Sequence, residues 1–216
     1  MKNKIVVVRD WKLSYWSLLS DSMYIFTKKR DSKTFDEIWL AEHYPVFTIG
    51  KSGNKNDIFH KSSIPIMYSN RGGKVTYHGP GQLLVYFLFN LKRLNISIKQ
   101  LVYLIELSII KTLDYFNIKS KIKNNHPGVF INEYKICFLG LRIIQGCSLH
   151  GISLNINMDL KPFSYIIPCG NQNIRVTQMT NFISPINNLL IKKILLCKIC
   201  KLFSFNEIIF SSPNLY

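Results

Sequence analysis

Residues whose side chains could bind a ligand or take part in a reaction gather in one glycine-rich segment, Arg71-Gly-Gly-Lys-Val-Thr-Tyr-His-Gly-Pro-Gly-Gln82. Five of its twelve residues are Gly or Pro, and it also holds two cations, a His, a Thr and a Tyr. A backbone without Cβ atoms can approach a ligand closely. A hairpin turn that binds no ligand is the alternative, but such a turn does not need this set of side chains around its glycines. We therefore expect a ligand-binding loop at residues 71–82.

A second candidate is Cys169, which lies between Pro168 and Gly170. A cysteine in that setting belongs to a turn, where its thiol can meet a substrate. A thiol becomes a nucleophile when a nearby positive charge or base favours its thiolate. Lys135 is the best candidate for this charge, because it lies in a mostly apolar segment. From spacing alone, an inert turn cysteine and a surface lysine remain the alternative.

Histidines next to glycine or proline are the other titratable candidates. His78 and His150 each precede a glycine, and either could carry a proton or donate a structural hydrogen bond. The structural role is the more usual one for an isolated histidine. His43 and His126 lie just before prolines, so we expect both in loops.

Other common site signatures are missing from the sequence. Cys197-Lys-Ile-Cys200 has CxxC spacing, but no second pair or His is near it, so we expect packed core cysteines rather than a zinc or redox site. No set of His, Cys, Asp and Glu has metal-site spacing, and no Walker or dinucleotide-binding loop occurs. These absences argue against metal chemistry and against the common ATP- or NAD-dependent enzymes.

The composition is that of a basic globular protein. The 216 residues are 47% hydrophobic and carry a net charge of +16, so we expect one domain with a substantial core. Neither a signal sequence nor an apolar stretch of ~18 residues is present, which favours a soluble cytoplasmic protein without membrane contact. The charge suits nucleic acid, an anionic membrane or acidic proteins. Compositional drift in a chain rich in Ile, Asn and Lys is an equal alternative.

Hydrophobic periodicity and capping residues predict the elements that must position these side chains. We expect strands at residues 4–9, 38–48, 83–89, 134–144 and 148–157, the last two joined as an antiparallel hairpin by Gln145-Gly-Cys147. We expect helices at residues 10–29 with Asp10 as N-cap, at 97–116 behind a Ser97 capping box, and after Ser184-Pro185. This order has no βαβ rhythm, so the fold class is α+β.

The glycine-rich segment resembles the signature of bacterial lipoyl(octanoyl) transferases, the octanoyl-acyl-carrier-protein:protein N-octanoyltransferases. The resemblance continues through Glu42-His-Tyr-Pro45, Lys135-Ile136, Gly146-Cys-Ser-Leu-His-Gly151, Asn155-Ile-Asn157 and Pro168-Cys-Gly170. It covers about residues 6–180 in the family's order and leaves 184–216 unmatched. It implies one catalytic domain over residues 1–216, with the mixed, largely antiparallel sheet and flanking helices of biotin and lipoate protein ligases.

The resemblance also implies a two-step acyl transfer without ATP, metal or other cofactor. Cys169 would take the octanoyl group from octanoyl-acyl carrier protein as a thioester, and Lys135 would favour its thiolate. The group would then pass to a lysine of a lipoyl domain, in 2-oxoacid dehydrogenase E2 subunits or the glycine cleavage H protein. The implied acyl-binding residues are Arg71, Gly72, Gly73, Lys74, Val75, Thr76, Tyr77, His78, Phe138, Leu139, Gly140, Gly151, Ile152 and Ser153.

Three positions depart from the family pattern. Phe138 stands where the family usually has a small residue, Ser153 where Ala is usual, and Asn70 where an acidic or hydroxyl residue is expected. The acyl tail needs an apolar slot, which we expect from the strands around Leu83, Phe87 and Leu139. Phe138 would shorten or reshape that slot.

Two other functions remain open at this point. An ATP-dependent lipoate or biotin ligase of the same fold would use an acyl-adenylate and would not depend on Cys169. A nucleic-acid-binding module is suggested only by the charge. The basic residues are scattered without interleaved aromatics, so we expect no nucleic-acid partner.

Overall fold

The computed structural model describes residues 4–124, 126–172 and 174–216. Its strands are β1 (Ile5–Ser14), β2 (Asp36–His43), β3 (Val46–Ile49), β4 (Ile66–Tyr68), β5 (Val75–His78), β6 (Gln82–Leu88), β7 (Lys121–Lys123), β8 (His126–Ile131), β9 (Tyr134–Ile144), β10 (Cys147–Asn155), β11 (Arg175–Val176) and β12 (Glu207–Phe210). Its helices are α1 (Trp16–Lys29), α2 (Leu91–Leu94), α3 (Ile98–Tyr115) and α4 (Asn188–Phe203). None of the described helices is long and apolar enough to cross a bilayer.

The strands form one large mixed sheet and one small sheet. The large sheet has the order β12-β1-β2-β6-β10-β9-β8-β7, and β11 pairs with β9 off this path. The pairs β12–β1, β1–β2 and β11–β9 are parallel. The other pairs of the large sheet, β2–β6, β6–β10, β10–β9, β9–β8 and β8–β7, are antiparallel. The small sheet has the order β4-β3-β5. The predicted α+β class, with a mixed and largely antiparallel sheet, is confirmed.

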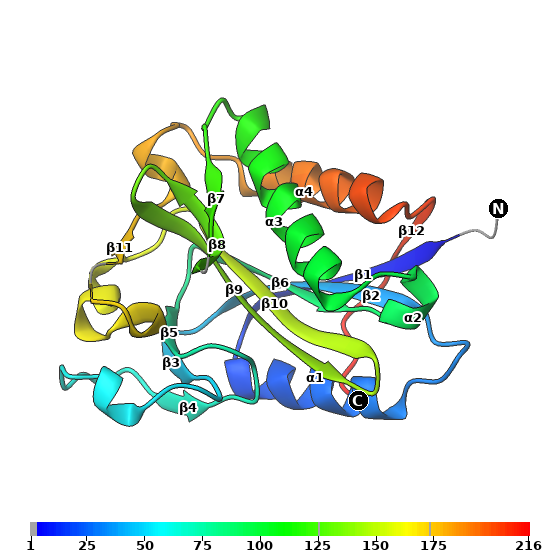
Figure 1. Cartoon of the computed structure of the whole chain (residues 1–216), viewed down its shortest axis with the longest axis horizontal. Coiled ribbons are helices and arrows are strands. Elements are labelled where there is room, and N and C mark those ends of the chain that lie inside the picture. The colour runs from blue at the N-terminus through cyan, green and yellow to red at the C-terminus, as the bar shows by residue number, and fades with distance from the viewer. Residues whose placement is uncertain (1–3, 125, 173) are drawn as a thin grey trace.

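Helices cover both faces of the large sheet (Figure 1). On one face α3 and α4 pack against the sheet around Leu101, Ile105 and Ile199. On the other face α1 packs through Leu19 and Met23 against its own hydrophobic cluster. The C-terminal helix therefore shares a core with the rest of the chain.

Two predicted elements agree closely with the structure. The helix behind Ser97 has a complete capping box, in which the Ser97 side chain accepts from Gln100 N and the Gln100 side chain accepts from Ser97 N. The predicted hairpin consists of β9 and β10, which pair from Cys147↔Ile144 to Leu154↔Cys137. These elements were readable because their signals are local.

Three predicted boundaries are wrong. β1 continues through Ser14, because Leu13 and Ser14 still pair with β2 after a bulge, so α1 begins at Trp16 and Asp10 is not its N-cap. The segment 38–48 forms two strands, which separate at Tyr44 and Pro45, where proline removes a backbone donor. The last helix starts at Asn188 instead of after Pro185, since the Asn187 side chain accepts from Leu190 N.

Candidate active site

The glycine-rich segment is held between the small sheet and the edge of β9 by backbone hydrogen bonds. Gly50 N donates to Lys74 O at 3.1 Å, and Gly72 N donates to Leu141 O at 2.9 Å. A Cβ on Gly50 would lie 2.4 Å from Gly73 O. The close approach of these chain segments therefore depends on glycine.

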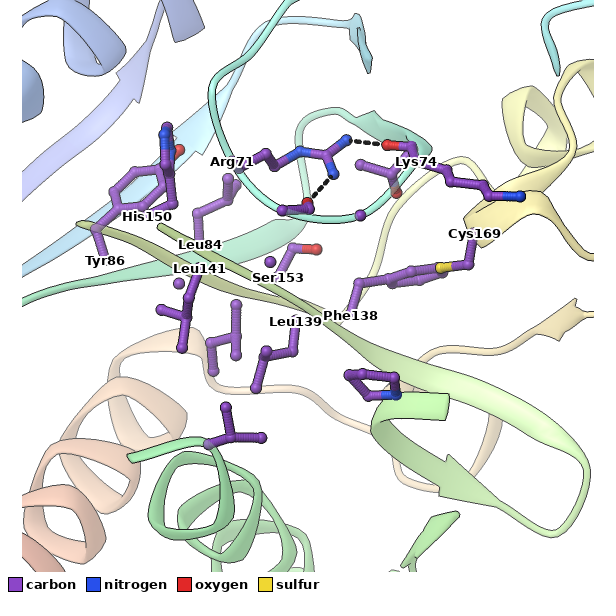
Figure 2. A pocket seen from close by; sticks show the side chains of 18 of the residues that line it. Arg71, Lys74, Leu84, Tyr86, Phe138, Leu139, Leu141, His150, Ser153 and Cys169 are labelled. Atoms are coloured by element: carbon purple, nitrogen blue, oxygen red, sulfur yellow. Dashed lines mark hydrogen bonds between the residues drawn. The ribbon is translucent and has the colours of Figure 1, made fainter. Parts of the chain in front are cut away.

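Arg71 holds this loop from the inside (Figure 2). Its buried guanidinium donates to the carbonyl and hydroxyl oxygens of Thr48, to Gly72 O and to Lys74 O. Burial lowers the pKa of Arg71 to about 10. The donors of this side chain thus fix the loop's backbone, and Arg71 shapes the pocket wall.

His78 belongs to a buried chain of hydrogen bonds behind the loop. Its Nδ1–H donates to Gln82 Oε1 at 2.7 Å, and Gln82 Nε2 donates to Asn155 Oδ1 at 2.8 Å. Burial is the main cause that lowers the pKa of His78 to about 3. The ring is neutral at physiological pH, which favours a structural donor over a proton carrier.

His150 has a similar environment on β10. Its backbone is left-handed, with φ of 62°, and its Nε2–H donates to Asn70 Oδ1. Burial, followed by the charge of Arg71, lowers the pKa of His150 to about 3. Asn70, one of the three departures from the family pattern, therefore accepts a hydrogen bond from the pocket wall.

The expectation that His43 and His126 lie in loops is wrong. His43 ends β2 and is buried, with Nδ1–H donating to Ser14 O at 2.9 Å and Nε2 accepting from the Tyr86 hydroxyl. Burial lowers the pKa of His43 to about 4. His126 is the first residue of β8 and lines the pocket.

Lys135 and Cys169 meet although 34 residues separate them. The Lys135 Nζ lies 3.4 Å from the Cys169 Sγ. Lys135 is 2% exposed on β9, whereas Cys169 is exposed in the turn Pro168–Gly170 with φ of 56°. After this turn the chain pairs with β9 again, and Thr177 N donates to Lys135 O at 3.0 Å. This return brings the thiol to the ammonium.

The Lys135 ammonium has three further neighbours. It donates to Pro127 O at 2.7 Å and lies 4.9 Å from the centre of the Phe138 ring and 5.4 Å from that of Phe130. Aromatic faces attract a cation when water is excluded. Phe138, where the family usually has a small residue, is therefore part of the lysine's environment. Its ring also stacks on Phe163, with centroids 5.2 Å apart.

A cavity of about 520 Å³ extends from this pair. Phe138 and Cys169 lie at one end, and Tyr86 and His150 at the other (Figure 2). The residues predicted for acyl binding that line it are Arg71, Gly72, Gly73, Lys74, Val75, Thr76, His78, Phe138, Leu139, Gly140, Gly151, Ile152 and Ser153. Tyr77 does not line it. Its ring packs between Phe47 and Phe163, because successive residues of β5 point to opposite faces.

The apolar part of the cavity differs from the predicted slot. Leu139 contributes as expected, but Leu83 and Phe87 lie in the core under α3 and α4. Leu84 and Tyr86 line the cavity in their place. Sequence reasoning also missed Trp16, Ile98, Val102, Leu141 and Ile143. Ile98 and Val102 are apolar but lie outside the buried stripe of α3. Apolar residues at these positions were a sequence signal that this side of the helix faces a binding site.

The CxxC pair on α4 does not contribute to this cavity. Cys200 is buried in the hydrophobic core, and burial raises its pKa to about 11. Cys197 is exposed. The core prediction is therefore right for Cys200 and wrong for Cys197.

A family model and two similar proteins point to the same family. The model of the lipoyl protein ligase A/B catalytic domain matches residues 15–200. The chain is 44% identical over 214 residues to an octanoyltransferase of Buchnera aphidicola subsp. Acyrthosiphon pisum, covering 99% of this chain and 100% of the relative. It is 50% identical over 204 residues to an octanoyltransferase of Buchnera aphidicola subsp. Baizongia pistaciae, covering 94% and 100%.

A solved structure supports the same fold. The crystal structure of lipoate-protein ligase A bound with ATP superposes with a TM-score of 0.78 and covers 100% of this chain and 90% of that one. The two sequences are 13% identical. This similarity shows the fold alone, and the reaction has to be argued from the site residues.

Proposed function

Because the chain belongs to the octanoyltransferase family of lipoyl protein ligase A/B catalytic domains, we propose that it moves an octanoyl group from acyl carrier protein to a lipoyl-domain lysine. The group travels as a thioester on Cys169. The single observation that carries this mechanism is the 3.4 Å contact between Lys135 Nζ and Cys169 Sγ at one end of the cavity.

In the first step the Cys169 thiolate attacks the carbonyl carbon of the octanoyl thioester. The new bond joins sulfur to carbon, and the carrier's thiolate leaves and takes up a proton. The buried Lys135 ammonium favours the attacking thiolate through its charge. A thioester is already activated, so this step requires no nucleotide.

In the second step the amine of a lipoyl-domain lysine attacks the Cys169 thioester. An amide forms, the carbon–sulfur bond breaks, and the amine releases one proton to solvent. The sulfur leaves as a thiolate beside the Lys135 ammonium. The oxyanion of each step needs N–H donors. Gly72 N–H is not one of them, because it donates to Leu141 O.

The octanoyl tail fits the apolar part of the cavity. Ile98 and Val102 from α3 face this space together with Leu139 and Leu141 from β9. At ~0.8 kcal/mol per buried CH2, the tail could contribute several kcal/mol of binding. The cavity volume of about 520 Å³ is within the usual range for small-molecule sites.

The remaining features of the proposal concern partners and setting. We expect residues 1–216 to act as one catalytic domain, since α4 shares its core with α3. The lipoyl domains of 2-oxoacid dehydrogenase E2 subunits and of the glycine cleavage H protein are the expected acceptors. The charge of +16 would speed encounter with acidic partner proteins. A free thiol is best preserved in a reducing compartment, which favours the cytoplasm. We propose no nucleic-acid, membrane, metal or cofactor role.

An intact-mass experiment tests the mechanism. The protein is incubated with octanoyl-acyl carrier protein without ATP, and its mass is measured before and after hydroxylamine. We expect an added octanoyl group that hydroxylamine removes. The Cys169→Ala variant should lack it, and the Cys197→Ala variant, which changes the other exposed cysteine, should keep it.

The same experiment separates the transferase from an ATP-dependent ligase. A ligase would form an acyl-adenylate and would not need the thiol. Full transfer by Cys169→Ser, or transfer that starts only when ATP and free octanoate are added, would contradict the proposal.

A further inference from the structure

The peptide group between Pro127 and Gly128 contacts Lys135 closely. Its carbonyl oxygen accepts from Lys135 Nζ at 2.7 Å. Gly128 has φ of 120°, and a Cβ there would lie 2.3 Å from Cys137 O and 2.8 Å from Lys135 Cε. Only glycine lets the backbone lie against the lysine stem in this way.

The other end of the same peptide group is bound by Glu106 of α3. Gly128 N donates to Glu106 Oε1 at 2.7 Å, and Glu106 is 5% exposed. A buried carboxylate is costly unless hydrogen bonds and opposite charges compensate for lost water. Burial raises the pKa of Glu106, whereas the Gly128 hydrogen bond and the Lys135 charge act in the opposite direction.

A peptide group is planar and rigid, so fixing one end fixes the other. Glu106 and Lys135 are therefore joined through one peptide unit. Glu106 acts on the lysine without touching the thiol or the cavity, because it is not among the cavity-lining residues.

We propose that Glu106 is a positioning residue, which holds the Pro127–Gly128 peptide so that its carbonyl keeps the Lys135 ammonium against Cys169. This inference rests on the proposed function, in which the same ammonium favours the thiolate. It adds a residue of α3 to the Lys135–Cys169 pair, whose other hydrogen-bond partner comes from β8.

The titratable groups that act on Lys135 come from separate elements. Cys169 belongs to the turn, Glu106 to α3 and Cys137 to β9 itself. The reactivity of Cys169 towards iodoacetamide reports the outcome directly, since the thiolate is the form that reacts. This measurement needs neither acyl carrier protein nor a lipoyl domain.

The experiment measures the alkylation rate of the Cys169 peptide at pH 6.5 and pH 9.5 by mass spectrometry. Three variants change this residue: Glu106→Leu removes the acceptor, Glu106→Asp withdraws it by one methylene, and Glu106→Gln keeps an acceptor at the same distance from the backbone. Lys135→Met is the reference for complete loss of the ammonium. Thr112→Val is the matched control, because Thr112 is also buried on α3 and bonds only within the helix.

We expect Glu106→Leu and Glu106→Asp to slow alkylation at pH 6.5 by about fivefold and to react normally at pH 9.5, where an ordinary thiol is ionised. Glu106→Gln and Thr112→Val should react nearly like the unchanged protein. If Glu106→Leu does not fold, the Asp and Gln variants decide.

Two results would overturn parts of this account separately. Unchanged alkylation in Glu106→Asp, with slow alkylation in Lys135→Met, would remove the role of Glu106 and leave the Lys135–Cys169 pair intact. Unchanged alkylation in Lys135→Met would contradict the proposed activation of the thiol itself.

Discussion

The turn that carries Cys169 and the strand that carries Cys137 present two thiols near the same lysine. Cys137 lies on β9, 1% exposed, with its thiol donating to Phe138 O. Burial raises the pKa of Cys137 far above its ordinary value, although the Lys135 charge opposes this. Cys169 is exposed and hydrogen-bonded to the ammonium. A neighbouring cation is therefore not sufficient, because a thiol must also be accessible and partly solvated to serve as a nucleophile.

The most direct way to break this comparison is to exchange the two thiols for alanine. Cys169→Ala should lower octanoyl transfer by about 10³-fold or more, because the covalent step is lost. Cys137→Ala should retain transfer. Octanoylation of a lipoyl domain, followed by mass spectrometry, measures both. Loss of transfer only in Cys137→Ala would reverse the assignment.

Removing the shared ammonium should have the next largest effect. Lys135→Met should lower transfer by about 10²-fold at pH 7, since less thiolate is available and the leaving sulfur loses its counter-charge. Lys123→Met is the control, because Lys123 also lies over the Phe130 ring but pairs with Glu133. Equal rates for the two variants would show that general charge, not position, matters.

The backbone beside the lysine offers a smaller test. Gly128→Ala should destabilise the fold by about 2–3 kcal/mol and slow transfer, because the new Cβ meets Cys137 O and the Lys135 stem. Gly146 also has a positive φ, 74° against 120° at Gly128, but open space around it, so about 1 kcal/mol is expected for Gly146→Ala. Urea unfolding compares the two. Equal losses would mean that the contacts of the new Cβ with Cys137 O and the Lys135 stem add nothing.

Burial, which suppresses ionisation of Cys137, should also be visible in the histidines around the cavity. The folded-state pKa values of His78 and His150 are about 3, below the unfolded value near 6.5. The unfolded chain therefore binds protons first, and stability is lost as pH falls from about 6.5 towards 3. We expect about 2 kcal/mol per histidine between pH 7.5 and 5. His150→Gln should reduce this slope, and a flat stability profile would contradict it.

Local signals made much of the fold predictable. The Ser97 capping box and the short link between β9 and β10 act within a few residues, and both agree with the prediction, although Cys147 belongs to β10 and not to the link. The start of α1 was misread, because the extra length of β1 comes from pairing with β2, which a local pattern does not contain. Asp10 looked like a cap but lies within a strand.

The site residues that belong to a sequence motif were predictable. Which side chains of a buried strand point into the cavity was not. The resemblance brought Lys135 and Cys169 together before the structure did, and spacing alone left the pair open. The facing of β6 could not be read, since all of Gln82–Leu88 is buried and its apolar run has no polar alternation. The sequence therefore predicts Leu83 and Phe87 in the cavity, where the structure has Leu84 and Tyr86. Glu106 was missed because a lone acid in a helix has no motif.

The exposure of Cys169 at one end of the cavity has a kinetic consequence. In the proposed mechanism the acyl carrier protein and the lipoyl domain present their reacting groups to the same sulfur, and two folded domains cannot occupy that position together. The acyl donor has to depart before the acceptor arrives. Steady-state rates should then obey double-displacement kinetics, with parallel lines in reciprocal plots when one substrate is varied at several fixed levels of the other.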